Sequence, residues 1–275
     1  MPSSSRAALA GAVLAALGVA LLRLLAFDVA PIHRADALTL HGFISLDRPS
    51  LHPLTSAVAR VADPAPYGAI GLVLLSIALA QARVRVAAGV AIVLLGAAVT
   101  TDYILKPGLG HRHAEDIVFP SGHATASMAL ALCAILVASP QVRAYVALLG
   151  AAFAIAVSYS FLSLGWHYPS DVLGGYLVAA AWTSAVVATL RWANARWPER
   201  TGRRAAGRAF SRVQARTLTA LVAGALLALV IAIAAVAPER ALDFLRVHTT
   251  FAAGAAAIAL AGLTVAGALT AILRD

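Results

Sequence analysis

Charged residues are scarce in this sequence: they make up 12% of 275 residues, about half the share typical of a soluble domain. Hydrophobic residues reach 61%, and the mean hydropathy is +0.86. These values exclude an ordinary soluble domain and favour one helical membrane domain. Cysteine is nearly absent too. Because Cys133 stands alone, no disulfide can form within the chain, and its place in an apolar run suits packing.

Long apolar runs predict the fold class, an all-α polytopic membrane bundle. A span needs about 20 mostly apolar residues, and backbone exposed to lipid must be helical. The first run is longer than a usual signal sequence, so we interpret it as a retained helix. About eight transmembrane helices are expected, at Ala7–Phe27, Pro66–Ala82, Val86–Leu105, Ser121–Ser139, Ala144–Leu164, Ser170–Leu190, Leu218–Ala237 and Phe251–Leu273. The segment Ala35–Val61, which holds Pro49 and Pro53, is expected to be a partly helical, interfacial excursion.

The arginines indicate the orientation of these spans. One predicted side holds Arg6, Arg83, Arg85, Arg143, Arg274 and a dense run from Arg191 to Arg216, whereas the opposite segments mix acids and bases to near neutrality. The positive-inside rule then makes both termini and the basic loop cytoplasmic. The net charge of +9 therefore reports topology. We expect no nucleic-acid partner, because the loop lacks interleaved stacking aromatics.

Lys106 is the single lysine among 21 basic residues. It ends the third predicted span, on the non-cytoplasmic side. A compact ammonium group is a good point-charge partner for phosphate. Taken alone, it fits equally well a snorkelling lysine at a helix end that pairs with Asp102 one turn earlier.

Pro120-Ser121-Gly122-His123 opens the fourth predicted span on the same side. Proline and serine favour a helix start, and glycine lets a ligand approach the backbone. Free N–H groups and the helix dipole would then bind an anion within reach of His123. The plain alternative is a capped helix with an interfacial histidine.

A histidine and an aspartate four residues apart, His167 and Asp171, open the sixth predicted span. They lie on one helical face, where the carboxylate can fix the imidazole tautomer and leave the other nitrogen nucleophilic. Alone, this motif also fits a helix cap. Together, the three motifs on one side suit phosphoryl transfer through a phosphohistidine, since ionisable groups at membrane depth are functional candidates.

These residues resemble the membrane branch of the type 2 phosphatidic acid phosphatase superfamily, whose motifs are Lys-x6-Arg-Pro, Pro-Ser-Gly-His and Ser-Arg-x5-His-x3-Asp. The second motif is complete here, and Ser160, His167 and Asp171 have the spacing of the third. The resemblance implies a six-helix phosphatase-like core over residues 1–190. A basic cytoplasmic loop would follow at 191–217, with two additional helices at 218–275.

By resemblance, His167 attacks phosphorus, Asp171 orients it and His123 protonates the leaving oxygen. Lys106, Ser121 and Gly122 would bind the phosphate. The family's two phosphate-binding arginines are altered. His113 stands at the first position with Arg112 one residue early, and Phe161 stands at the second. Arg112 or His113 is the candidate substitute for the first arginine, and nothing obvious replaces the second.

The sequence therefore predicts a membrane lipid phosphatase acting on a lipid phosphate or polyprenyl (di)phosphate. No metal or other cofactor is expected, because the His111–Asp116 cluster lacks diagnostic metal-ligand spacing. The expected setting is a bacterial plasma membrane, with the site on the non-cytoplasmic side and the bilayer lipid as partner. Two alternatives stay open, a lipid-to-acceptor phosphotransferase and a catalytically weak lipid-phosphate-binding protein. A transporter is disfavoured, because the polar residues cluster at one interface rather than at broken midplane helices.

Overall fold

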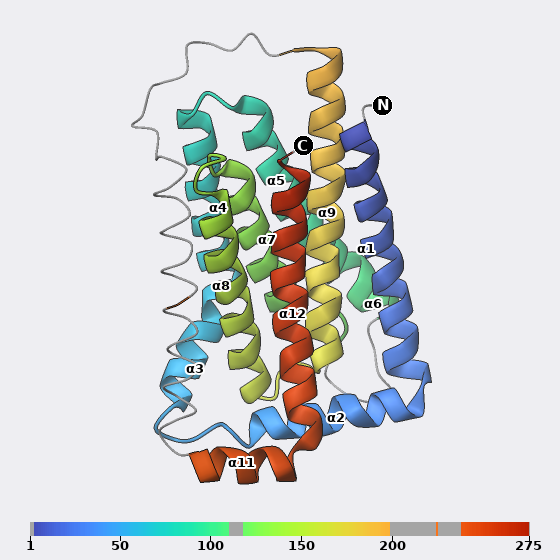
Figure 1. Cartoon of the computed structure of the whole chain (residues 1–275), viewed down its shortest axis with the longest axis vertical. Coiled ribbons are helices and arrows are strands. Elements are labelled where there is room, and N and C mark those ends of the chain that lie inside the picture. Colours follow the sequence, from blue (N-terminus) through green and yellow to red (C-terminus); the bar gives the residue numbers. More distant parts are fainter. Residues whose placement is uncertain (1–2, 110–117, 199–223, 225–237, 275) are drawn as a thin grey trace.

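The computed structural model describes residues 3–109, 118–198, 224 and 238–274, and in these ranges the chain is a bundle of helices (Figure 1). The first half holds α1 (Ser3–Asp28), α2 (Ala30–Ile44), α3 (His52–Ala59), the 3₁₀ turn η1 (Arg60–Ala62), α4 (Pro64–Ala80) and α5 (Val84–Val99). The second holds the π-helical η2 (Thr100–Leu105), α6 (Lys106–Leu109), α7 (Gly122–Val137), α8 (Arg143–Ser163), α9 (Pro169–Arg196), α11 (Pro238–Val247) and α12 (Thr249–Ile272). The predicted all-α class is confirmed.

Where the structure describes the predicted spans, they are helical except for one or two residues at some of their ends. Among the described residues, five helices are long and apolar enough to cross a membrane, or six if the bent pair of α3–η1 and α4 forms one span. In this pair, the axis of α4 is bent by 54° from that of α3–η1. α7 is apolar but only 16 residues long. Leu218–Ala237 lies outside the described residues apart from position 224, so the count of eight remains a prediction.

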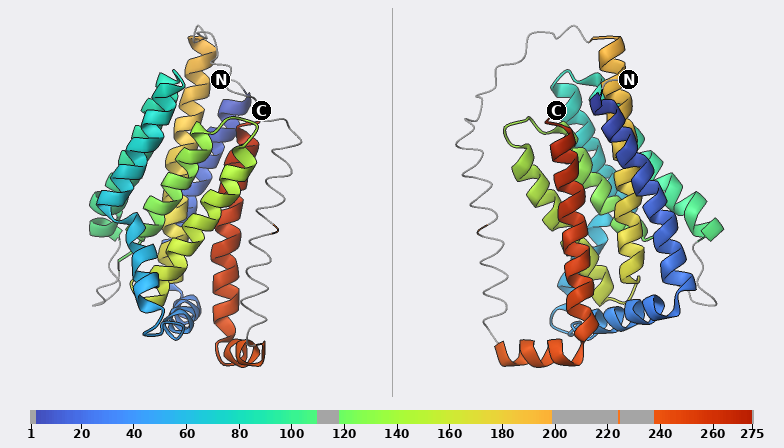
Figure 2. Two further views of the ribbon diagram at one scale, coloured as in Figure 1. Left: turned by 90° about the vertical axis from the view of Figure 1, so that its left-hand side faces the viewer. Right: turned by 45° about the vertical axis from the view of Figure 1, so that its right-hand side comes forward.

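Two short helices lie across one end of the bundle, while the long helices run along its axis. α2 and α11 cross the end opposite to the two termini (Figures 1 and 2). Pro49 falls in the turn between α2 and α3, and Pro53 falls in the first turn of α3, where proline is tolerated. The expected excursion at Ala35–Val61 is therefore partly helical, as predicted.

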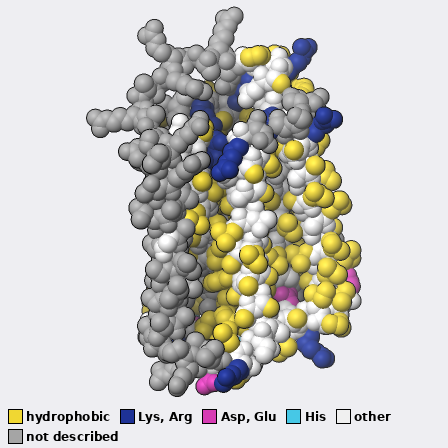
Figure 3. All heavy atoms as spheres, in the orientation of Figure 1, with side chains coloured by type: hydrophobic (Ala, Val, Ile, Leu, Met, Phe, Trp, Pro, Cys, Tyr) yellow, Lys and Arg dark blue, Asp and Glu magenta, His cyan; other side chains and the backbone are white. Residues whose placement is uncertain are grey.

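The end with the termini is rich in arginine, visible as dark blue side chains in Figure 3 above an apolar flank. Several of these arginines satisfy carbonyls at helix C-termini, where the last turn leaves acceptors unpaired. Arg83 donates to the carbonyls of Leu136 and Val137 at 3.1 and 2.7 Å. Arg143 donates to Leu273 at 3.0 Å, and Arg191 donates to Ile272. The arginines that indicate the orientation thus also complete α7 and α12.

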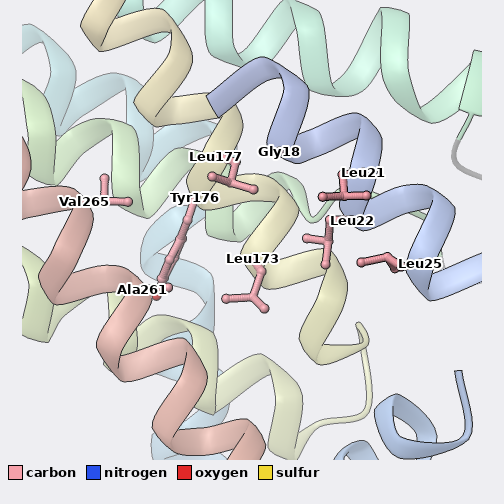
Figure 4. A pocket seen from close by; sticks show the side chains of 9 residues that line it. All are labelled: Gly18, Leu21, Leu22, Leu25, Leu173, Tyr176, Leu177, Ala261 and Val265. Carbon is pink, nitrogen blue, oxygen red and sulfur yellow. The ribbon is translucent and has the colours of Figure 1, made fainter. Parts of the chain in front are cut away.

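An apolar groove of about 290 Å³ lies between α1, α9 and α12. Figure 4 shows Leu21 and Leu22 of α1 facing Leu173 and Tyr176 of α9, with Val265 of α12 on the far wall. Apart from Tyr176, the residues that line it are aliphatic or glycine. This groove offers no group for acid–base chemistry, and the motif histidines lie elsewhere.

Candidate active site

The site begins at the N-terminus of α7, where Ser121 is the N-cap residue. Its hydroxyl accepts the N–H of Ala124 at 3.2 Å, and its own N–H donates to the Asp171 carbonyl at 3.0 Å. The N–H groups of Gly122 and His123 have no hydrogen-bond partner among the described residues. Two open donors at the positive end of a helix dipole can bind an anion.

Lys106 lies beside these donors. η2 carries Asp102 and leads directly into Lys106, whose Nζ is 2.6 Å from Asp102 Oδ1. A Cβ placed on Gly122 would lie 3.1 Å from that Nζ and 3.3 Å from Asp102 Oδ1. Glycine therefore lets the pair reach the start of α7. The pairing expected from the one-turn spacing is present, and it brings a cation to the open N–H groups.

A pocket of about 400 Å³ opens between α4, η2 and the start of α7. Its wall combines the ionisable Asp102, Lys106 and His123 with Gly122 and the apolar first turn of α4. The volume is at the lower end of the range for small-molecule sites. The pocket has room for a headgroup-sized polar group next to the donors of α7.

His167 and Asp171 meet at the N-terminus of α9. His167 Nδ1 is 3.5 Å from Asp171 Oδ2, and the two side chains are 13% and 0% exposed. The distance is longer than a well-formed hydrogen bond, and this buried Nδ1 has no hydrogen-bond partner among the described residues. The same carboxylate oxygen accepts the N–H of Tyr168 at 2.8 Å. Asp171 is thus anchored in the first turn of its own helix, facing the imidazole.

Phe161 packs against both motif histidines. Its ring centroid is 5.9 Å from that of His123 and 5.6 Å from that of His167, and the side chain is fully buried. Trp166 packs on the other side of the site, with its ring 5.5 Å from His123. The position where the resemblance implies a phosphate-binding arginine therefore holds an apolar ring in contact with both histidines.

Close helix packing brings α7 and α9 together at this point. A Cβ on Gly175 would lie 2.8 Å from both the Ser121 carbonyl oxygen and the Thr125 nitrogen. A Cβ on Gly174 would lie 2.5 Å from the Phe119 ring. Only glycine permits this approach. The two glycines that follow Asp171 thus hold the start of α7 against the helix that follows His167.

Two carboxylates that sequence reasoning missed also reach the site. Asp36 of α2 is 8% exposed and accepts the backbone N–H of Ser170 at 2.9 Å and its hydroxyl at 2.6 Å. Asp63 Oδ1 lies 3.0 Å from His123 Nε2. Asp36 belongs to the segment Ala35–Val61 expected at the interface, and Asp63 lies two residues after it; an acid in a mostly apolar stretch was the available signal.

The remaining predicted site residues cannot be placed. Arg112 and His113 lie outside the described residues, so their expected role in the phosphate clamp remains a prediction. Within the described ranges, no group of three or more His, Cys, Asp or Glu side chains could hold a metal ion. Independence from metal and other cofactors likewise remains a prediction.

Comparison with known proteins agrees with the motifs. Residues 99–196 match the model of the PAP2 superfamily, a segment that contains Lys106, His123, His167 and Asp171. The fold is similar to a crystal structure from Bacillus subtilis described as the first transmembrane PAP2 type phosphatidylglycerolphosphate phosphatase. The TM-score is 0.50 at 16% identity, covering 70% of this chain and 99% of that one. No curated protein matches the sequence. The resemblance inferred from the motifs is confirmed, with a membrane fold of that type.

Proposed function

We propose that this protein is a membrane lipid phosphatase that hydrolyses a lipid phosphate or polyprenyl (di)phosphate through a phosphohistidine, at the non-cytoplasmic face. One observation carries the proposal. His123 and His167 both lie against Phe161, at the adjoining starts of α7 and α9. Lys106 and the open N–H groups of α7 lie next to His123.

The proposed reaction has two steps. Because Nδ1 of His167 faces Asp171, its Nε2 attacks phosphorus, and the bond from phosphorus to the lipid oxygen breaks. His123 gives a proton to that leaving oxygen. Water then attacks phosphorus, the P–N bond breaks, and His123 takes the proton of the water, so that inorganic phosphate leaves and both histidines are restored.

Charge stabilisation would come from groups at the start of α7. The N–H donors of Gly122 and His123 and the ammonium of Lys106 would face the equatorial oxygens of the phosphoryl group, with Ser121 holding the helix start. Phosphoryl transfer depends mostly on such positioning and electrostatic stabilisation. For the remaining part of the clamp, the sequence-based candidates are still Arg112 and His113.

The buried ring of Phe161 favours a second candidate, a protein that binds a lipid phosphate with little turnover. A guanidinium fork binds phosphate in two parallel hydrogen bonds, and phenylalanine cannot do so. A weaker clamp lowers transition-state stabilisation, while Lys106 and the α7 donors still favour an anion. A phosphotransferase remains the close variant of the enzyme, since the acceptor that enters decides the product.

The test is phosphate release by purified protein from a panel of lipid phosphates, in detergent and in lipid nanodiscs. We expect release by the wild type and none by His167→Ala. His52→Ala is the control, because His52 is an exposed histidine that pairs with Asp47 at 2.8 Å away from the site. When a reaction with ³²P-labelled lipid is quenched in alkaline SDS, label should stay on the wild type and on His52→Ala but not on His167→Ala, because the P–N bond of phosphohistidine survives base and breaks in acid. Binding without release, and with no trapped label, would leave the binding protein as the correct interpretation.

A further inference from the structure

Asp63 is the partner of the proposed acid, His123. Its Oδ1 lies 3.0 Å from His123 Nε2, although the two residues are 60 positions apart in the chain. The aspartate comes from the bend between η1 and α4, and the histidine from the first turn of α7. Their side chains are 40% and 25% exposed, respectively. The pair therefore lies at the edge of the site rather than in the sealed core.

The backbone context explains why the Asp63 carboxylate is available. Asp63 is the N-cap residue of α4, with extended φ and ψ of −61° and 157°. An aspartate at this position usually accepts an N–H from the second or third helical residue. Here its side chain makes no such bond. Pro64 and Pro66 occupy the first and third helical positions and have no N–H, so fewer donors compete and the carboxylate can turn to His123.

The residues around His123 favour pairing of Asp63 with only one of its two ring nitrogens, Nε2. Phe161 and Trp166 pack against the imidazole and restrict its rotation. Among the described residues, the other ionisable groups near it are His167, Lys106, Asp102, Tyr67 and Tyr103. Nδ1 of His123 has no hydrogen-bond partner among the described residues. If Asp63 accepts the proton on Nε2, then Nδ1 is the nitrogen available to a substrate oxygen.

We propose that Asp63 is a positioning residue that holds the Nε2 proton of His123, stabilises the imidazolium and directs Nδ1 to the leaving lipid oxygen. This inference rests on the proposed phosphatase function. It gives the site two histidine–carboxylate pairs, and both imidazoles contact Phe161. Asp171 serves His167 in the attack, and Asp63 serves His123 in proton donation. A carboxylate in this role fixes tautomer and orientation and does not itself take the proton.

The kinetic test compares Asp63→Asn and Asp63→Ala with wild type on two substrates, a lipid phosphate and p-nitrophenyl phosphate. Only the lipid alkoxide needs a proton as it leaves. We therefore expect lipid turnover to fall, by up to the about 10²–10⁴-fold that general acid catalysis contributes, with little change for the aryl substrate. Without the negative charge, the imidazolium loses its proton at lower pH, so the alkaline limb of the pH–rate profile should move to lower pH.

Asp47→Asn is the matched control, because Asp47 forms the same kind of pair with His52. It should change neither rate nor pH profile, and Asp63→Glu should partly restore both. Equal losses on the two substrates, or an unmoved alkaline limb, would refute the positioning role. Such a result would leave the phosphatase function intact, since wild type and His167→Ala in the same assay test that function separately.

A second readout does not depend on turnover. In ¹⁵N spectra of histidine-labelled protein, the His123 signal is identified by its loss in His123→Gln. We expect the neutral wild-type ring to carry its proton on Nε2. Asp63→Asn should keep that tautomer through its amide oxygen, and Asp63→Ala should lose the preference. A wild-type ring protonated on Nδ1, or no change in Asp63→Ala, would overturn the pair even if the protein released no phosphate.

Discussion

Gly175 lies where α9 crosses the first turn of α7, and replacing it with alanine tests whether this crossing holds the site together. The added Cβ would lie 2.8 Å from the Ser121 carbonyl oxygen and from the Thr125 nitrogen. Ordinary contacts begin near 3.4 Å, so the helices must separate by about 0.6 Å. The bond from the Ser121 N–H to the Asp171 carbonyl, now 3.0 Å, would stretch beyond hydrogen-bonding distance.

The magnitude follows from three opposing effects. Overpacking costs about 1–3 kcal/mol, and the lost hydrogen bond costs about 0.5–1.5 kcal/mol. Alanine recovers about 1 kcal/mol of helix propensity. The net destabilisation of Gly175→Ala should be about 2 kcal/mol. At about 2–4 °C per kcal/mol for a chain of this size, the apparent Tm should fall by about 4–8 °C.

The assay is thermal unfolding of purified variants in one detergent, with phosphate release measured alongside. Gly68→Ala is the control, because nothing lies within 4 Å of a Cβ at that position of α4, and it should leave Tm unchanged or slightly raised. Release by Gly175→Ala should fall by about ten- to a hundredfold, since a 1 Å misplacement of reacting groups costs about 10² in rate. If Gly175→Ala matched Gly68→Ala in both measurements, the crossing would not position the site.

Three further predictions follow from the site and the topology. Phe161→Arg should lower Tm in the absence of ligand, because the guanidinium is buried between two histidines without a partner; inorganic phosphate should restore Tm in this variant and have little effect on wild type. EDTA should leave phosphate release unchanged, and loss of activity that a divalent cation restores would count against metal-independent chemistry. Single cysteines introduced at Ser4 and Ser211 should react with a membrane-impermeant thiol reagent only after the cells are permeabilised. A cysteine at Ala241 should react in intact cells. Labelling at Ser211 from outside intact cells would show that the predicted orientation is wrong.

Local patterns in the sequence predict the start of each helix that carries a motif. Pro120-Ser121 begins α7 and Pro169 begins α9, because proline, serine and aspartate act within a few residues of themselves. The pairing of Lys106 with Asp102 follows equally from their spacing along one helical path. These features are predictable because the residues that determine them lie within one helical turn of each other.

Contacts between distant segments were not predictable in this way. Asp36 reaches Ser170 across 134 residues, and Asp63 reaches His123 across 60. Neither aspartate lies in a recognisable motif, and their roles depend on how α2 and the α3–α4 bend pack against the bundle. The contact of Phe161 with both histidines likewise follows from how α8 packs against α7. Single-sequence reasoning has no access to such packing.

The short length of α7 sets the depth of the proposed site. Sixteen residues span about 24 Å, whereas the hydrocarbon core of a bilayer is about 30 Å thick. The C-terminal carbonyls of α7 are bound by Arg83 at the arginine-rich end. If that end lies at one membrane surface, the N-terminus of α7 stops short of the other. Polar groups at such depth are costly unless they are paired. Asp63 with His123 and Asp102 with Lys106 meet that requirement. A phosphate held on a lipid in the membrane can reach this depth while its chains stay among the bilayer lipids, which suits a lipid substrate better than a water-soluble one.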